Sequence, residues 1–236
     1  MRSARVLAAV LLLAGCDGDA SRTEPVPPPV PPATASAGTG WGPSPSQPAT
    51  TSPATEPPAT GGWEVTVYYT AVEDYHSGAP ETVTGCPRID CAHGDEDLGE
   101  YKSDFVAAVQ QEGTGRTASG DYLNWSHDTG YWLDSRPRDA AGRALRPFVS
   151  AAADPQVLAR GTRFRIVGCG RQDDGSRAAA EVCAALRAAR WTVTDEFTPG
   201  LGGDKHVDAY IGEQTGPGFT DSPWYLTLHD ATLRTG

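Results

Sequence analysis

Residues 151–155 read AAADP, residues 191–195 read WTVTD, and residues 206–212 read HVDAYIG. The second and third stretches mix β-branched and aromatic residues in alternation with polar ones, which predicts short, half-buried β-strands. Each stretch contributes one aspartate: Asp154, Asp195 and Asp208. These three aspartates stand out because each lies in or directly after such a stretch.

The rest of residues 63–236 reads as short strands separated by glycine and proline turns, with two helices inserted. Further strands are predicted at 63–70, 148–153, 161–168 and 224–228. Helices are predicted at 103–112, ended by Gly113, and at 176–190. Residues 76–100 and 113–120 are predicted to be loops and turns. This pattern predicts a mainly β domain, and more specifically a small barrel.

The order of the aspartate stretches resembles the 3D domain, a family named for its three aspartates. The similar features are Ala-Asp-Pro followed by Gly161-Thr162, a strand leading to Asp195 and a glycine-rich turn, and the strand Val207-Asp208-Ala209-Tyr210. Upstream, Tyr68-Tyr69-Thr70 and Thr117-Ala118-Ser119-Gly120 are also similar to family segments. The 3D domain is a double-psi β-barrel found in MltA-type lytic transglycosylases and in stationary-phase proteins. The resemblance therefore implies a six-stranded double-psi β-barrel with inserted helices over residues 63–236.

The chain also departs from the family pattern. The turn at 196–205 is longer than usual, and residues 169–190 add two cysteines and a helix. The sequence gives no sign of the second domain that MltA-type enzymes carry. These departures concern the activity more than the fold.

The resemblance implies cleavage of peptidoglycan glycan strands in the manner of a lytic transglycosylase, with no organic cofactor and no metal. Asp208 would be the single acid/base, Asp195 its neighbour, and Asp154 a supporting residue. Such an acid needs a raised pKa, which apolar surroundings or a nearby carboxylate provide. Each aspartate could instead accept backbone N–H bonds in a tight turn.

Other polar and aromatic residues are weaker candidates. Tyr69 and Thr70 are expected to line the cleft, and Trp125 to stack on a sugar ring, although core packing explains them equally well. His206 lies beside the Asp208 strand and could affect the pH response. If water rather than the sugar were the nucleophile, a second carboxylate would be needed, and Glu112 and Asp121 are the candidates for it.

A non-catalytic function is the alternative. Double-psi barrels also occur as expansin-like and barwin-like domains that bind polysaccharide, and as protein inhibitors. An Asp208 that is buried and fully satisfied by backbone N–H groups would favour this alternative, whereas an Asp208 exposed to an open cleft would favour an enzyme.

The N-terminus reads as the signal of an exported lipoprotein. Arginines at positions 2 and 5 precede an apolar run that ends in Leu13-Ala14-Gly15-Cys16. This ending resembles a lipobox, which implies that residues 1–15 are removed and that Cys16 is lipidated. Residues 16–62 are rich in proline, threonine and serine and are predicted to be a disordered linker. We expect the protein to be anchored to the outer face of the cytoplasmic membrane, in the cell envelope.

Charge and cysteine content narrow the list of partners. The formal net charge is -11, which argues against a nucleic-acid partner and leaves peptidoglycan or another cell-wall polysaccharide as the expected one. Four cysteines follow the linker: Cys86, Cys91, Cys169 and Cys183. They allow three disulfide pairings, of which we favour the two local ones, 86 with 91 and 169 with 183. A zinc site is disfavoured, since no Cys-x-x-Cys pair is present.

Overall fold

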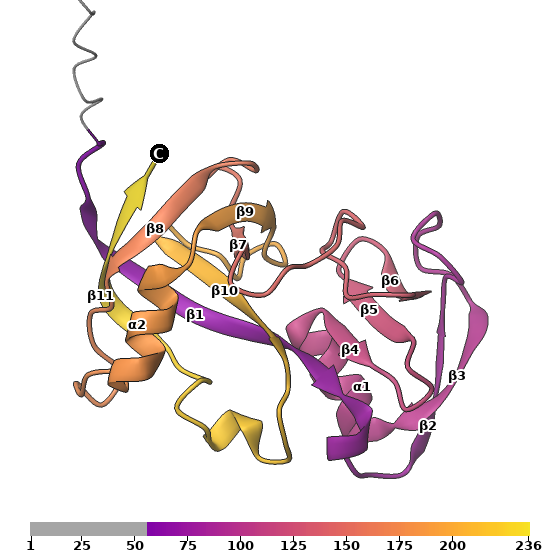
Figure 1. Cartoon of the computed structure of the whole chain (residues 1–236). Coiled ribbons are helices and arrows are strands. Elements are labelled where there is room, and N and C mark those ends of the chain that lie inside the picture. Colours follow the sequence, from indigo (N-terminus) through magenta and orange to yellow (C-terminus); the bar gives the residue numbers. More distant parts are fainter. Residues whose placement is uncertain (1–55) are drawn as a thin grey trace, which may run out of the picture. The chain divides into compact units, whose positions relative to one another are not determined.

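The computed structural model describes residues 56–236. The predicted signal (1–15), the predicted lipidation site Cys16 and most of the predicted linker lie outside these residues. The described part of the chain is mainly β, with two α-helices and two short 3₁₀ helices (Figure 1). Within it, no helix is both long and apolar enough to cross a membrane.

Six strands form a closed barrel. They are β1 (Thr60–Val72), β7 (Ser150–Ala153), β8 (Arg163–Gly168), β9 (Trp191–Asp195), β10 (His206–Glu213) and β11 (Leu228–Thr235). The hydrogen-bonded order is β10-β7-β9-β8-β11-β1, and a further pairing of β10 with β1 closes the sheet. The β1–β10 and β7–β9 pairs are parallel, while the other pairs are antiparallel. The mainly β, six-stranded barrel predicted from the sequence is confirmed.

The barrel closes around alternate apolar residues of its strands, because successive side chains of a strand point to opposite faces. Val65, Ile166, Trp191 and Val193 are buried in this core, together with other residues of the same strands. Helix α2 (Ala180–Ala188) adds further apolar side chains to the core. The Trp191 ring packs in a stacked arrangement with Phe164, and its Nε1 donates a hydrogen bond of 3.1 Å to the carbonyl of Leu186, so the largest core residue has no unpaired polar atom.

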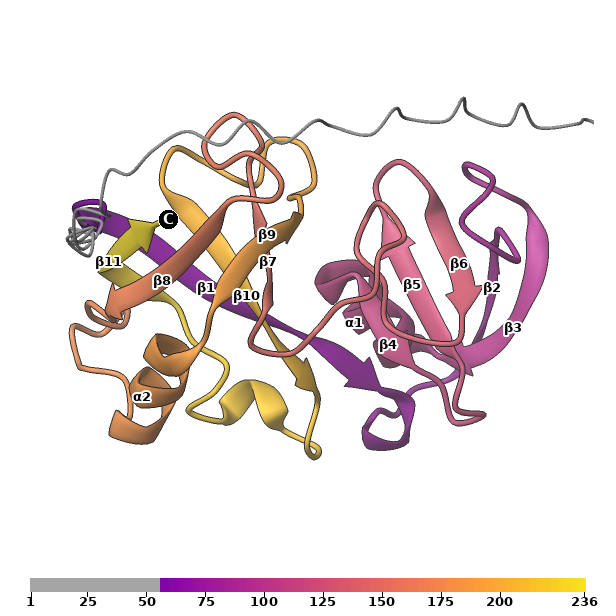
Figure 2. The same cartoon turned by 45° about the horizontal axis from the view of Figure 1, so that its top comes forward.

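A second β region lies beyond the barrel end of β1, and we call residues 73–138 the hairpin region (Figure 2). It contains the short helix η1 (Glu73–Tyr75), the pair β2 (Pro80–Gly85) and β3 (Glu96–Lys102), helix α1 (Ser103–Glu112), and the strands β4 (Thr114–Arg116), β5 (Tyr122–Ser126) and β6 (Gly130–Asp134). Strand β1 continues into this region and pairs with β4. Phe105 and Val109 of α1 pack with Leu123 of β5 in a separate core.

Several sequence predictions need correction. Residues 76–100 and 113–120 were expected to be loops, but parts of them form β2, β3 and β4. Residues 224–227 were expected to begin a strand, but they follow helix η2 (Phe219–Asp221) in a turn, and β11 begins at Leu228. Residues 60–62 were assigned to the linker, but they are the first residues of β1.

Helix α1 ends at Glu112, as predicted, because Gly113 adopts the left-handed conformation that terminates helices, with φ of 82°. Both favoured disulfides are confirmed. Cys86 pairs with Cys91 in the hairpin region, and Cys169 pairs with Cys183 between β8 and α2. Two disulfides fit a protein that folds in an oxidising, extracytoplasmic compartment.

Candidate functional site

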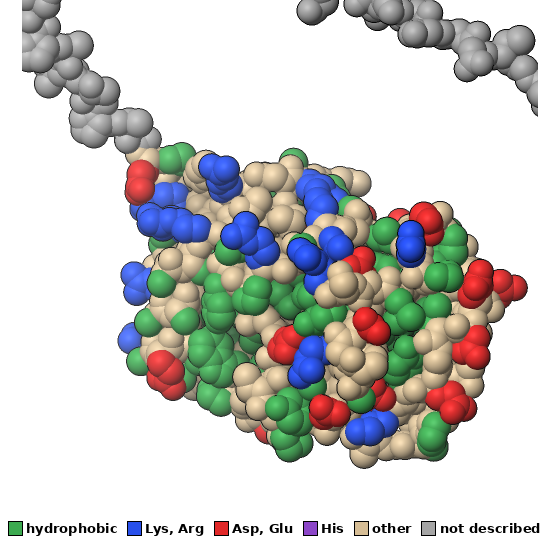
Figure 3. All heavy atoms as spheres, turned by 45° about the vertical axis from the view of Figure 1, so that its right-hand side comes forward, with side chains coloured by type: hydrophobic (Ala, Val, Ile, Leu, Met, Phe, Trp, Pro, Cys, Tyr) green, Lys and Arg blue, Asp and Glu red, His purple; other side chains and the backbone are tan. Residues whose placement is uncertain are grey.

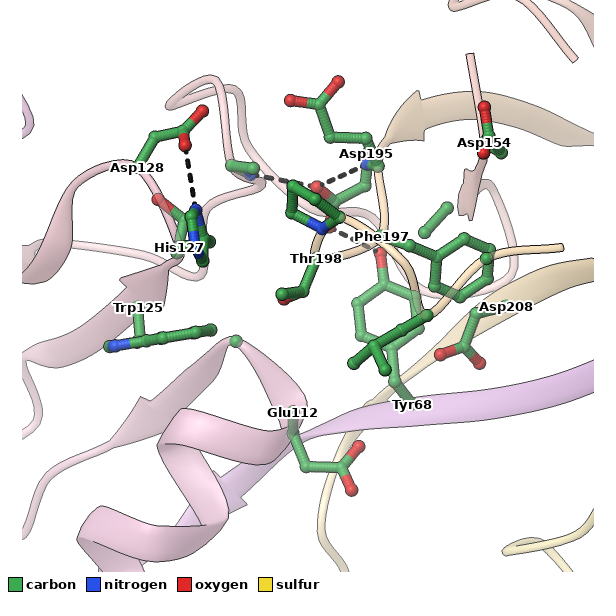
Figure 4. Close-up of a pocket in the computed structure, with 18 of the residues that line it drawn as sticks. Tyr68, Glu112, Trp125, His127, Asp128, Asp154, Asp195, Phe197, Thr198 and Asp208 are labelled. Carbon is green, nitrogen blue, oxygen red and sulfur yellow. Dashed lines mark hydrogen bonds and ion pairs between the residues drawn. The ribbon is translucent and has the colours of Figure 1, made fainter. Parts of the chain in front are cut away.

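A cavity of about 570 Å³ is lined by barrel residues and by residues of the hairpin region (Figure 4). The barrel contributes the three predicted aspartates, Asp154, Asp195 and Asp208. The hairpin region contributes Glu112 from the end of α1 and Trp125 from β5. The volume lies within the range of pockets that bind small ligands or short segments of a polymer.

Asp208 is held on β10 with one side-chain oxygen unpaired. Its Oδ1 atom is buried and has no hydrogen-bond partner among the described residues. Burial raises the pKa of Asp208 to about 6, although the Thr66 hydroxyl and the nearby His206 act in the opposite direction. A buried, unpaired carboxyl oxygen is costly to keep, so its presence in a cavity is a feature of a functional site.

Asp195, at the end of β9, is well supplied with hydrogen bonds. Its Oδ1 accepts the backbone N–H of Ala140 at 3.0 Å and that of Glu196 at 2.9 Å, and its Oδ2 accepts the Tyr68 hydroxyl at 3.2 Å. Burial nevertheless raises the pKa of Asp195 to about 6, with a further contribution from the charge of Asp139. The satisfied oxygens indicate that this side chain organises its surroundings, including the Tyr68 ring.

Asp154 begins a turn after β7. Its Oδ1 accepts the backbone N–H of Gln156 at 2.8 Å, and its carbonyl accepts those of Val157 and Leu158. A Cβ placed on Gly202 would lie 3.1 Å from the Asp154 Cβ, so the glycine-rich loop passes close over this turn. Asp154 therefore lines the cavity while it also anchors a turn, which was one of the two roles expected for it.

Glu112 is one of the two carboxyls that the hairpin region brings to the cavity lining, the other being Asp128. It is only 7% exposed, and its two hydrogen bonds are long: 3.3 Å from the Tyr69 N–H and 3.4 Å from the Tyr225 hydroxyl. Burial raises the pKa of Glu112 to about 8, and the charge of Asp208 adds to the effect. Glu112 is also the last residue of α1, where the helix dipole disfavours a negative charge.

The cleft-lining role expected for Tyr69 and Thr70 differs from what the structure shows. The Tyr69 ring packs against Phe219 at 4.8 Å in the second core, and the Thr70 hydroxyl bonds to that of Tyr210 at 2.6 Å in the interior. Tyr68 lines the cavity instead, because successive side chains of β1 point to opposite faces and the register of β1 shifts between residues 68 and 70. Tyr68 was not among the residues expected to line the cleft.

Some of the other candidate residues line the cavity and others do not. Trp125, for which stacking on a sugar ring was predicted, lines the cavity (Figure 4). Asp121 is exposed, and it is absent from the residues that line the cavity. His206 lines the cavity with its ring stacked on Phe197 at 4.5 Å, and it hydrogen-bonds the Thr66 hydroxyl at 2.8 Å. Among residues 56–236, no group of three or more His, Cys, Asp or Glu side chains is placed to hold a metal ion.

The chain was compared with known proteins. No protein-family model and no curated protein sequence matches it. Lytic transglycosylases are among the solved structures that resemble it. Escherichia coli MltA with bound chitohexaose is 13% identical, with a TM-score of 0.48 over 73% of this chain and 71% of that one. A membrane-bound lytic murein transglycosylase from Agrobacterium tumefaciens is 12% identical, with a TM-score of 0.45 over 73% of each chain. LtgG of Burkholderia pseudomallei is 13% identical, with a TM-score of 0.38 over 73% of this chain and 70% of that one.

Proposed function

We propose that the cavity holds a glycan strand of peptidoglycan and that Asp208 cleaves it in a lytic transglycosylase-like reaction. The observation that carries this proposal is the buried Oδ1 of Asp208, a residue that lines the cavity, because this oxygen has no hydrogen-bond partner among residues 56–236. A carboxyl with a pKa near 6 is in part protonated at mildly acidic pH and can therefore act first as an acid and then as a base.

The proposed reaction balances with the sugar's own hydroxyl as nucleophile. The Asp208 carboxyl donates its proton to the glycosidic oxygen as the bond from that oxygen to the anomeric carbon breaks. The resulting carboxylate takes the proton of the 6-hydroxyl of the N-acetylmuramic acid unit that contains this anomeric carbon. The oxygen of that hydroxyl forms the new bond to the anomeric carbon. The products are a shortened strand and a 1,6-anhydro end, and Asp208 returns to its starting state. Proximity of the hydroxyl replaces an activated water.

The neighbouring residues have supporting roles in this proposal. Asp195 fixes the Tyr68 hydroxyl by the 3.2 Å hydrogen bond, so both stay beside Asp208 in the cavity wall. Asp154 secures the turn under the glycine-rich loop. Trp125 offers an aromatic face to the C–H surface of a sugar ring.

Hydrolysis by water would require a second, ionised carboxylate to activate that water. Glu112 is one of the two residues suggested for this role from the sequence, and it lines the cavity. With its pKa raised to about 8, Glu112 is largely neutral at pH 7 and is a poor base. The protonation of Glu112 therefore argues against Glu112 as the base of a hydrolysis reaction.

The predicted lipobox places this activity at the cell wall. In this part of the proposal, residues 1–15 are removed, lipid on Cys16 holds the protein at the outer face of the cytoplasmic membrane, and residues 16–55 let the folded part reach the wall. Metabolic labelling with a radioactive fatty acid, in the native chain and in Cys16→Ala, tests it. Loss of the label in the variant is expected, and label-free native protein would contradict the anchor.

A digest of purified peptidoglycan by the full-length chain, read by mass spectrometry, tests the reaction. We expect fragments ending in 1,6-anhydro-N-acetylmuramic acid, and none with Asp208→Asn. Reducing ends would identify a hydrolase instead. Absence of cleavage, together with equal sedimentation of both proteins on the polymer, would identify a non-catalytic polysaccharide-binding protein.

A further inference from the structure

The loop between β9 and β10 forms part of the cavity wall. Residues Glu196 to Gly202 all line the cavity, and Phe197 and Thr198 lie on the same side of it as Asp195 and Asp208 (Figure 4). This is the turn whose sequence is longer than that of the 3D family. Its added length therefore lies next to the proposed acid.

The two ends of this loop are fixed. Glu196 forms an ion pair with Arg160 at 3.0 Å, and the Phe197 ring stacks on His206. At the other end, the Gly202 carbonyl hydrogen-bonds the Nδ1 of His206 at 3.0 Å. One histidine thus holds both ends of the loop against the strand that carries Asp208.

Between these ends, a turn presents one apolar side chain to solvent. The Leu201 N–H donates to the Thr198 carbonyl at 3.0 Å, and Gly200 has a φ of 89°, which glycine adopts without strain. Leu201 is 68% exposed, more than any other large hydrophobic residue of the described chain. No core contact explains this leucine, yet it lines the cavity with Asp208.

We propose that Leu201 is a substrate-positioning residue, whose side chain packs on the apolar C–H face of a sugar ring in the glycan bound at Asp208. This inference rests on the proposed function. Trp125 provides a second apolar surface from the hairpin region, so the glycan strand would be held by contacts from both regions that line the cavity. The rest of the lining supplies polar groups suited to hydroxyls and amides, among them Gln110, Gln111 and Gln156.

A sugar fits this surface better than an anionic ligand does. Six carboxyl groups line the cavity: Glu112, Asp128, Asp154, Asp195, Glu196 and Asp208. Among residues 56–236, Arg138 is the one arginine or lysine that lines the cavity, and it is paired with Asp134 at 2.8 Å. An uncharged ring with apolar faces and hydroxyl edges avoids the repulsion that an anion would meet there.

Binding to glycan strands freed of their peptides tests this proposal. The affinity of Asp208→Asn is compared with that of the Asp208→Asn, Leu201→Ser double variant, so that cleavage does not affect the measurement. We expect Leu201→Ser to weaken binding about fivefold to tenfold and Leu201→Phe to restore it. The control is Tyr75→Ser, which removes the other exposed large hydrophobic of the described residues (39% exposed) and is expected to leave binding unchanged.

We expect Leu201→Ser to leave the stability of the fold unchanged, because the Leu201 side chain is 68% exposed and contributes little to the core. A change in binding therefore does not arise from unfolding. Equal affinity of the Leu201→Ser and parent proteins would overturn the inference. Its failure is distinct from failure of the proposed reaction, since a protein that binds strands without cleaving them still reports on Leu201. If the parent does not bind strands at all, both proposals are wrong.

Discussion

The barrel and the hairpin region differ sharply in charge. Residues 73–138 contain 13 acidic and five basic residues, whereas residues 139–236 contain 12 acidic and 11 basic ones. Much of the acidic charge of the hairpin region is exposed on and around β3, at Asp90, Asp95, Glu96 and Asp97. Figure 3 shows acidic side chains gathered mainly at one side of the molecular face that it draws. The carboxyls with clearly raised pKa values are instead buried around the cavity. Burial, and not local charge density, distinguishes the carboxyls of the proposed site.

The largest expected effect separates Asp208 of the barrel from all other carboxyls. Asp208→Asn removes the proposed acid while keeping the size of the side chain, and we expect peptidoglycan cleavage to fall roughly 1,000-fold. The thermal midpoint should not fall, because the substitution removes an unpaired carboxyl from a buried position. Turnover assays and thermal unfolding of the same protein preparations measure both.

Asp204→Asn is the matched control, since Asp204 is an exposed residue of the loop that precedes the same strand. Its activity should equal that of the native chain. The native activity should also decline as the pH rises through about 6, where Asp208 loses its proton. A variant Asp208→Asn that retains even a tenth of the activity would move the acid role to another carboxyl.

Glu112 of the hairpin region should affect stability as well as the site. Its pKa is about 8 in the folded chain and near 4.5 when exposed, so the unfolded chain loses this proton first as the pH rises. Because of this group, the free energy of unfolding falls between about pH 4.5 and pH 8, and above pH 8 it levels off. We expect Glu112→Gln to be more stable than the native chain at pH 8, by up to about 4 kcal/mol, with no gain at pH 4.

Urea unfolding at both pH values measures this difference. Glu100→Gln, at an exposed position of β3, is the control and should change little at either pH. A pH-independent gain in Glu112→Gln would show that its carboxyl is not held neutral by burial.

The two disulfides allow a direct comparison of the regions. Cys169–Cys183 closes a segment of sequence separation 14 in the barrel, and Cys86–Cys91 closes one of 5 in the hairpin region. Longer loops lose more entropy when they are closed, so replacing both cysteines of a pair by alanine should cost roughly 3 kcal/mol in the barrel and roughly 2 in the hairpin region. Equal losses in urea unfolding would show that loop entropy does not set the difference.

The smallest expected effect concerns Trp125, an aromatic residue that the hairpin region contributes to the cavity lining. Trp125→Ala should raise the KM for soluble glycan strands about tenfold with a smaller change in kcat, because stacking on a sugar contributes about 1.4 kcal/mol or less. Trp125→Phe, which keeps an aromatic face, should recover most of the affinity. If kcat alone fell, Trp125 would contribute to the reacting centre and not to binding.

The sequence was most informative about the barrel. Strands with regular alternation, such as residues 191–195 and 206–213, could be predicted because half-buried strands have a period of two. The hairpin region was missed because β4 has only three residues, Thr114 to Arg116, and because β3 is rich in exposed acidic residues that are rare in strands. Its tertiary contacts, and not local propensity, stabilise these strands.

The site was predictable only in part, for a related reason. The three aspartates share a motif, so their convergence could be expected from a resemblance. The choice between Tyr68 and Tyr69 depends on the register of β1, which shifts by one residue at that point. Glu112 looks like an ordinary residue at a helix end, and only the packing of α1 against β1 and Tyr225 buries its carboxyl.

Strand β1 has a further consequence for how the protein is made. Its residues pair with the last strands of the chain, Thr60 with Leu233 and Glu64 with His206, across more than a hundred residues. Such long-range pairing folds slowly, and the barrel can close only after β11 has been synthesised and released. The environment that raises the pKa of Asp208 does not exist before that closure. On the proposed function, the chain is therefore inactive on peptidoglycan until β11 is in place.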